Sequence, residues 1–260
     1  MMDIPVKVQL GIYGKEIDSG ILPLDEGTIG NSSSWAGSYH ILSMGRHYCD
    51  YIYRPEPELQ SVIEFPKFDC FSRLTSKTKS QQVVGNIGEC IAGIFARKRL
   101  RANISDIALL TTNAKRMRPD YLMNLNGPEI RGLFSQMPLS ENHVSYLADK
   151  RWWPVESKAT KKIGSIDSRE KGLSQLISFW AKEKESLQET VGCGLIVTFF
   201  YEDSVQAHQE YEIWVTLILP SNKPNLITQL SDPRFNSKKK ENRVRIIKET
   251  FRYFHGCYIP

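Results

Sequence analysis

The segment Arg151–Thr160 places two charged side chains at the end of an apolar run. It reads RWWPVESKAT, with Glu156 and Lys158 separated by a single residue. Burying an unpaired charge costs several kcal/mol, so these side chains either form a structural ion pair or are held in place for chemistry. Another carboxylate, Asp120, follows a proline in the segment RMRPDYLMN at residues 116–124. Carboxylates bind cations and an ammonium neutralises an anion, so the three residues are a candidate site.

The elements that would position these residues follow from the hydrophobic pattern. Lys77–Leu100 is predicted to be a helix, because apolar residues recur at positions 83, 87, 91 and 94, and Glu89 lies off that apolar stripe. Residues 125–150 are polar and predict an insertion with some helix. The remaining predicted elements are strands at Ile107–Thr111, Arg116–Asn124, Trp152–Ala159, Gly194–Tyr201 and Tyr211–Leu219, and a helix at Leu173–Trp180.

The order of these elements is helix, strand, strand, strand, helix, strand. This order predicts an α/β sheet with helices on its faces. Pro119 indicates that the strand at Arg116–Asn124 has an irregular, partly exposed middle, since proline is disfavoured in a central strand.

Composition divides the chain into three predicted regions. Residues 1–76 would form an accessory β-rich region, with strands at Val6–Tyr13 and Tyr48–Tyr53. Residues 77–220 would form the core. Residues 221–260 would form a basic C-terminal extension with a helix at Arg243–Phe254. The extension contains the run Lys238–Lys240, which is either a solvated patch or a contact with nucleic acid.

The element order and the charged residues together resemble the PD-(D/E)XK nuclease superfamily, which has the restriction-endonuclease-like fold. The core of that family is a mixed sheet flanked by helices in the order αβββαβ, and the resemblance covers residues 77–220. The matching residues are Pro119-Asp120 and Glu156-Ser157-Lys158, with Glu89 on the preceding helix. The 36 positions from Asp120 to Glu156 require the insertion at residues 125–150.

The resemblance implies a metal site for phosphodiester hydrolysis. Asp120 and Glu156 would supply oxygen ligands to Mg²⁺ (or Mn²⁺), which prefers carboxylates together with waters. Ser157 would add its backbone carbonyl, so that its side chain would not be critical. Glu89 would hold a metal-bound water or a second metal ion.

The resemblance also assigns roles to Lys158 and to residues around it. Lys158 would orient the attacking water and neutralise the scissile phosphate. Gln175 is similar to a helix glutamine that some exonuclease-like branches place beside the catalytic lysine, although Phe179 stands where those branches have tyrosine. The candidate phosphate-binding cations are Arg116, Arg118, Lys161 and Lys162.

Composition argues against several other classes of protein. The 260 residues are 41% hydrophobic and 24% charged, which is typical of a soluble globular protein, and the net charge of +5 permits nucleic acid as a partner without requiring it. Five cysteines without a CxxC pair argue against a disulfide framework and a zinc ribbon. No signal peptide and no apolar run long enough to cross a bilayer are found, so we expect a cytoplasmic protein without membrane contact.

The sequence therefore predicts a magnesium-dependent nuclease, with DNA rather than RNA as the expected substrate. The resemblance further suggests a role in bacterial antiphage defence, beside a separate ATPase or helicase subunit. One alternative is a nuclease-fold subunit that has lost activity and binds nucleic acid or scaffolds a complex. Another is a sequence-specific restriction endonuclease that acts as a homodimer. Structural alternatives also remain, since Glu156 and Lys158 would suit a solvated ion pair and Glu89 a helix surface.

Overall fold

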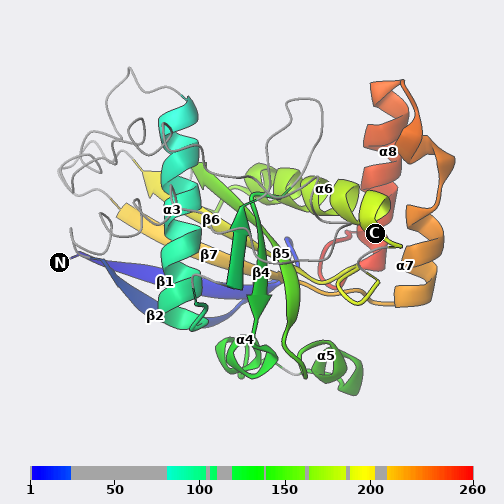
Figure 1. Cartoon of the computed structure of the whole chain (residues 1–260). Helices are drawn as coiled ribbons and strands as arrows, with labels where there is room; N and C mark the ends of the chain where they lie inside the picture. Colours follow the sequence, from blue (N-terminus) through cyan, green and yellow to red (C-terminus); the bar gives the residue numbers. More distant parts are fainter. Residues whose placement is uncertain are drawn as a thin grey trace.

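A single mixed sheet organises the chain. The structure is a computed structural model that describes residues 2–24, 81–103, 106–109, 119–137, 139–161, 164–185, 188–202 and 210–259. Within these residues, seven strands lie in the order β2-β1-β7-β6-β5-β4-β3 and six α-helices flank them (Figure 1). The predicted mixed α/β architecture is therefore confirmed.

The strands are β1 (Met2–Leu10), β2 (Glu16–Leu24), β3 (Ile107–Leu109), β4 (Tyr121–Leu125), β5 (Arg151–Thr160), β6 (Gly194–Glu202) and β7 (Glu210–Ile218). The α-helices are α3 (Gln81–Arg99), α4 (Gly127–Leu133), α5 (Glu141–Tyr146), α6 (Ile166–Glu183), α7 (Lys223–Leu230) and α8 (Lys240–Thr250). Two 3₁₀ turns flank α8, η4 (Pro233–Asn236) before it and η5 (Phe251–Tyr253) after it.

The pairing of the strands is part antiparallel and part parallel. β3, β4 and β5 form an antiparallel meander, and β5 then pairs in parallel with β6. β6 pairs antiparallel with β7, and β7 pairs in parallel with β1 of the N-terminal hairpin. The predicted β-rich N-terminal region is thus, in its described part, an extension of the same sheet.

The two faces of the sheet are covered by different helices. Side chains such as Trp153 and Val155 of β5 pack with α3 and α4 into one apolar core. The other face packs against α6, α7 and α8, for example through Ile196 of β6. Alternate residues of a strand point to opposite faces, so Glu156 and Lys158 belong to the α6 face. None of the helices in the described ranges is long and apolar enough to cross a membrane.

Segments with a strong apolar pattern form the elements that were predicted for them. The predicted strands at 152–159, 194–201 and 211–219 correspond to β5, β6 and β7, and the predicted helix at 77–100 corresponds to α3. The insertion at 125–150 contains α4 and α5. It also contributes buried Ile130, Phe134 and Leu147 to the core. The predicted strand Tyr48–Tyr53 lies outside the described residues.

The structure corrects the expectation for the segment around Pro119. β4 begins only at Tyr121 and is an internal strand, paired with β3 on one side and β5 on the other. Pro119 is buried and precedes the first ladder residue, so its missing N–H removes no hydrogen bond from the sheet.

Helix boundaries were also misjudged. α6 begins at Ile166, well before the predicted start at Leu173, because its polar first turns show no apolar stripe. α7 was not predicted, although Asn222 caps it and Pro224 lies in its first turn. The predicted helix Arg243–Phe254 is α8, which begins at Lys240 and passes into a 3₁₀ turn at Phe251.

Candidate functional site

Strand β5 carries Glu156 and Lys158 on one face of the sheet, just past the point where its ladder with β4 stops. The ladder between β4 and β5 stops at the pair Tyr121–Val155, so the residues after Val155 extend past the start of β4. Glu156 is fully buried, and its Oε1 accepts a hydrogen bond from Nζ of Lys158. The Lys158 side chain keeps 21% of its surface exposed. The pair is therefore partly buried, and the expectation of an exposed pair on a solvated strand end does not describe it.

Asp120 occupies the position where β4 would continue beside β5. Its Oδ2 accepts hydrogen bonds from the backbone N–H of Ser157, at 2.7 Å, and from the Ser157 hydroxyl, at 2.5 Å. The Asp120 carboxylate thus accepts the hydrogen bond from the Ser157 N–H that a backbone carbonyl would accept if the ladder with β4 continued. This geometry gives the Ser157 side chain a direct role in holding Asp120, contrary to the expectation that this side chain would not be critical.

Helix α3 brings Glu89 to the same end of β5. A Cβ atom on Gly88 would lie 3.2 Å from the carbonyl carbon of Lys158 and 3.3 Å from the nitrogen of Ala159. The absence of a side chain at Gly88 therefore lets α3 approach the backbone of β5 closely. The hydroxyl of Tyr121 donates to the backbone carbonyl of Glu89 at 3.1 Å, which ties this turn of α3 to β4.

The electrostatics show that the three carboxyl groups interact. Burial, together with the negative charge of Asp120, raises the pKa of Glu89 to about 8, and Lys158 opposes both effects. Burial likewise raises the pKa of Asp120, against the opposing effects of Lys158 and the Ser157 hydrogen bonds. The pKa of Glu156 is raised by burial and by the charges of Asp120 and Glu89, again against Lys158. Within the described ranges, three carboxyl groups therefore interact with the ammonium of Lys158, an arrangement typical of functional sites.

We call Glu89, Asp120, Glu156 and Lys158 the carboxylate cluster. The sequence analysis had selected all four, and the structure brings them together from α3, β4 and β5. Gln175 lies half-buried on α6, one turn after Gly172, where a Cβ atom would lie 3.4 Å from Cγ of Glu156. Its role stays a prediction. Lys161 is exposed just after β5, whereas Arg116, Arg118 and Lys162 lie outside the described residues.

Some residues of the site were missed by the sequence analysis. Gly88 allows α3 to approach the backbone of β5, and Gly172 allows α6 to approach Ile196 of β6 from the other face. A glycine inside a helix is a sequence signal for such close packing. Thr198 is the register partner of Lys158 on β6, is fully buried, and has no hydrogen-bond partner for its Oγ1 among the described residues. No local pattern in the sequence distinguishes Thr198.

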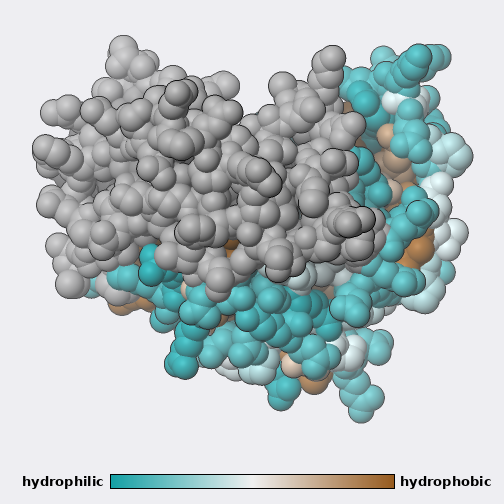
Figure 2. Space-filling view, in the orientation of Figure 1, coloured by the Kyte–Doolittle hydropathy of each residue, from teal (hydrophilic) through white to brown (hydrophobic). Residues whose placement is uncertain are grey.

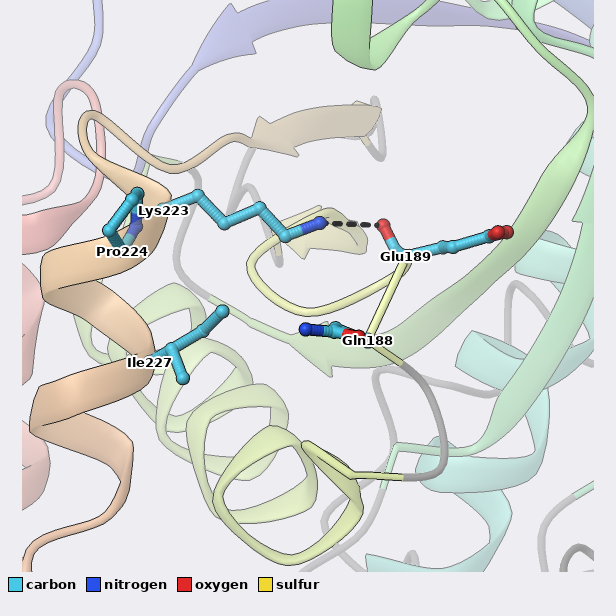
Figure 3. Close-up of a pocket in the computed structure, with 5 residues that line it drawn as sticks. All are labelled: Gln188, Glu189, Lys223, Pro224 and Ile227. Atoms are coloured by element: carbon cyan, nitrogen blue, oxygen red, sulfur yellow. Dashed lines mark hydrogen bonds between the residues drawn. The ribbon is translucent and has the colours of Figure 1, made fainter.

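Two shallow pockets lie elsewhere on the surface. One is lined by Gln188, Glu189, Lys223, Pro224 and Ile227, where Nζ of Lys223 donates to the Glu189 carbonyl at 3.1 Å (Figure 3). α7 follows the C-terminal end of β7, whereas Glu156 and Lys158 are level with Thr216 and Trp214 in the middle of β7. The other lies between α4 and α5. Neither is lined by a residue of the cluster, so the candidate site is defined by its charged groups.

The carboxylate cluster does not form a finished metal site as it stands. In the part of the chain that the structure describes, no three His, Cys, Asp or Glu side chains converge closely enough to hold a metal ion. Glu156 bonds Lys158, Asp120 bonds Ser157, and Oε2 of Glu156 is buried without a described partner. Comparison of the chain with protein-family models, with curated proteins and with solved structures gives no match.

Proposed function

We propose that the chain is a divalent-metal-dependent nuclease that hydrolyses phosphodiester bonds in DNA. The observation that carries the proposal is the gathering of Glu89, Asp120 and Glu156 around the ammonium of Lys158. The order α3-β3-β4-β5-α6-β6, with α4 and α5 inserted between β4 and β5, supports a restriction-endonuclease-like core. In such a core the acidic residue opens the second strand and the Glu-x-Lys triplet lies on the third.

The residues present fit a hard divalent cation such as Mg²⁺. Magnesium ions in proteins are bound by one or two carboxylates together with several waters, and no cage of three side chains is needed. Asp120 and Glu156 supply the carboxylates, and the buried, unpartnered Oε2 of Glu156 is an available donor. The Ser157 carbonyl would be the third ligand, since N–H and C=O of one strand residue point to the same side and its N–H already meets Asp120. The bound ion would supply charge neutralisation at the phosphate and a more acidic water.

The side chains of the cluster then have distinct tasks in hydrolysis. A water oxygen forms a bond to phosphorus, the bond from phosphorus to one sugar oxygen breaks, and that oxygen leaves with a proton. Lys158 offsets the negative charge that grows on the phosphate and orients the attacking water. Its ion pair with Glu156 fixes the ammonium at the strand end before substrate arrives.

The test is cleavage of supercoiled plasmid DNA by the purified chain with Mg²⁺ and with excess chelator. We expect cleavage only with the metal, and a loss of about a hundredfold or more in Lys158→Ala and in Asp120→Ala. Lys150→Ala is the matched control, because Lys150 pairs with Asp106 at 2.8 Å beside the other end of β5.

Three results would contradict the proposal. One is undiminished cleavage in chelator, and another is a Lys158→Ala variant that cuts at the wild-type rate. The third is a chain that binds DNA but never cleaves it, which would identify the inactive, DNA-binding alternative.

A further inference from the structure

The positive charge of the chain is concentrated in one short segment. Residues 238–252, KKKENRVRIIKETFR, contain seven of the 34 Lys and Arg residues of the chain and two of its 29 Asp and Glu residues. The remaining 27 cationic and 27 acidic residues balance, so this segment alone accounts for the net charge of +5. Its cationic side chains, all exposed, are Lys238, Lys239, Lys240, Arg243, Arg245, Lys248 and Arg252.

The fold arranges part of this charge along one side of α8. Arg245, Lys248 and Arg252 follow at intervals of three and four residues, so they form one stripe along the helix and the turn after it. At 1.5 Å per residue the stripe extends over roughly 10 Å. We call these three residues, together with Lys238–Lys240, the basic α8 surface. At the edge of the molecule where Figure 1 places α8, Figure 2 shows hydrophilic (teal) side chains with smaller hydrophobic (brown) patches between them.

The basic α8 surface is part of the folded body of the protein. Ile247 and Phe251 pack into the core beneath α6, and Phe254 stacks on Trp180 with ring centroids 5.3 Å apart. Arg234 of η4 bonds Glu249 of α8 at 2.9 Å. Because the helix is anchored in this way, its cations are presented without the loss of chain entropy that a disordered tail would suffer on binding.

We propose that the basic α8 surface binds the phosphate backbone of DNA outside the cleavage site. The choice of DNA as the ligand rests on the proposed function. The basic α8 surface would add a second contact with the DNA, independent of base sequence, to the contact at the carboxylate cluster. A line of cations on a helix suits a line of phosphates, because each neutralised phosphate releases counterions. An anionic membrane is the poorer fit, since an interfacial helix needs a free apolar face and Ile246 and Ile247 of α8 are buried.

The experiment measures binding of the full chain to a short fluorescent DNA duplex in chelator, across about 50 to 200 mM salt. In the triple variant Arg245→Gln, Lys248→Gln and Arg252→Gln, we expect binding to weaken about tenfold or more. The slope of log K against log salt should fall by about 0.9 for every phosphate that the variant no longer neutralises.

The matched control is Lys15→Gln, Arg101→Gln and Arg131→Gln, which removes three exposed charges elsewhere. Arg101 pairs with Glu129 much as Arg245 pairs with Glu249, so each variant loses one surface ion pair. We expect the control to retain most of the wild-type affinity for DNA. Its slope of log K against log salt should be steeper than that of the α8 triple variant. Thermal unfolding of both variants verifies that α8 remains folded.

The inference and the proposed function fail in different ways. Equal DNA affinity and equal salt slope in the two triple variants would overturn the inference, even if the wild-type chain cleaves DNA. Binding to phosphatidylserine vesicles without binding to the duplex would also overturn it. Conversely, a chain that never cleaves but loses DNA binding in the α8 variant would contradict only the proposed function.

Discussion

Glu89, Asp120 and Glu156 lie close to the ammonium of Lys158 beside the C-terminal half of β5, and neighbouring groups offset the repulsion between the three carboxylates. Glu156 has its ion pair with Lys158, and Asp120 has two hydrogen bonds from Ser157. For Glu89, the charge of Lys158 opposes the effects of burial and of the charge of Asp120 on its pKa. The arrangement is therefore unfavourable for stability and suited to binding a cation, as at many functional sites.

At this scale the Ser157 hydroxyl is expected to matter for activity. Ser157→Ala removes the 2.5 Å hydrogen bond to Asp120 and leaves the backbone bond, so the carboxylate is held less firmly. We expect cleavage to slow about tenfold, which corresponds to about 1.4 kcal/mol, a typical value for a hydrogen bond to a charged group. Ser157→Thr keeps the hydroxyl and should retain most of the activity.

The matched control for this prediction is Ser145→Ala. The Ser145 hydroxyl donates to a backbone carbonyl in exposed helix α5, away from the cluster. Single-turnover rates at several Mg²⁺ concentrations are the measurement. A Ser157→Ala variant that matches wild type throughout the titration would show that the backbone N–H alone positions Asp120.

Glu89 is expected to make stability depend on alkaline pH. Its pKa is raised from the ordinary value of 4.5 to about 8, so between these values the folded chain keeps a proton that the unfolded chain has released. The stabilisation from this proton is fully present below about pH 4.5 and is lost as the pH rises through about 8. Glu89→Gln removes the titration, so the variant should become more stable than wild type as the pH rises. The gain at pH 9 should be at least about 1 kcal/mol, since one unit of pKa shift is worth about 1.4 kcal/mol.

Urea unfolding in chelator at pH 5, 7 and 9 is the measurement. Glu185→Gln, at an exposed position beyond α6, is the control and should leave the pH profile unchanged. If Glu89→Gln and wild type lose stability in parallel as the pH rises, then burial and the charge of Asp120 do not raise the pKa of Glu89.

At the scale of elements, the site depends on how closely two helices approach β5. α3 lies against one face of the strand at Gly88, and on the other face α6 contacts Ile196 of β6 and Glu156 of β5 at Gly172. At Gly88 the neighbouring atoms belong to the backbone of β5, which cannot rotate away as a side chain can. Tyr121 completes the contact by bonding the carbonyl of Glu89.

A pair of Gly→Ala substitutions tests this packing. Gly132→Ala in α4 meets no atom within 4 Å, so the better helix propensity of alanine should stabilise the protein by up to about 1 kcal/mol. Gly88→Ala offers the same propensity gain but places a Cβ atom 3.2–3.3 Å from the backbone of Lys158 and Ala159. We expect no net stabilisation from Gly88→Ala and a severalfold slower cleavage, because Glu89 and Lys158 move apart. Equal stabilisation by the two substitutions, with unchanged activity, would contradict the close contact.

At the scale of the whole molecule, a chain of buried polar groups links the N-terminal hairpin to α6. Nη1 of Arg169 donates to Gln9 of β1 at 2.8 Å, and Gln9 donates to Thr216 of β7 at 2.8 Å. The guanidinium also lies 4.8 Å from the centre of the Trp214 ring. Gln9 is completely buried, so this network joins β1 to α6 and to its neighbour β7 in the interior of the protein.

Arg169→Leu should therefore destabilise the whole sheet. The substitution leaves Oε1 of Gln9 buried without its donor, which costs about 1–3 kcal/mol. The double variant Arg169→Leu, Gln9→Leu removes both partners and should recover part of that loss. Urea unfolding of the two variants at neutral pH measures the difference. Gln9→Leu alone completes the comparison. If the double variant loses at least as much free energy of unfolding as the two single variants together, then Arg169 and Gln9 do not stabilise the fold as a pair.

The apolar pattern of the sequence predicts the elements that are buried on one or both faces. β5, β6, β7 and α3 were predicted within a few residues, because burial requires a regular apolar period in each of them. Residue type and spacing also selected Glu89, Asp120, Glu156 and Lys158. The nuclease activity and its metal stay predictions, since chemistry inferred from residue types needs a biochemical test.

Other features became visible only once distant segments were placed together. β1 pairs with β7 across about two hundred residues, and the Asp120–Ser157 and Gln9–Arg169 bonds also join distant positions. No local period encodes such pairings, because they depend on which strands become neighbours in the sheet. The start of β4 was misjudged for a related reason. The effect of Pro119 depends on where the ladder begins, and the neighbouring strands set that position.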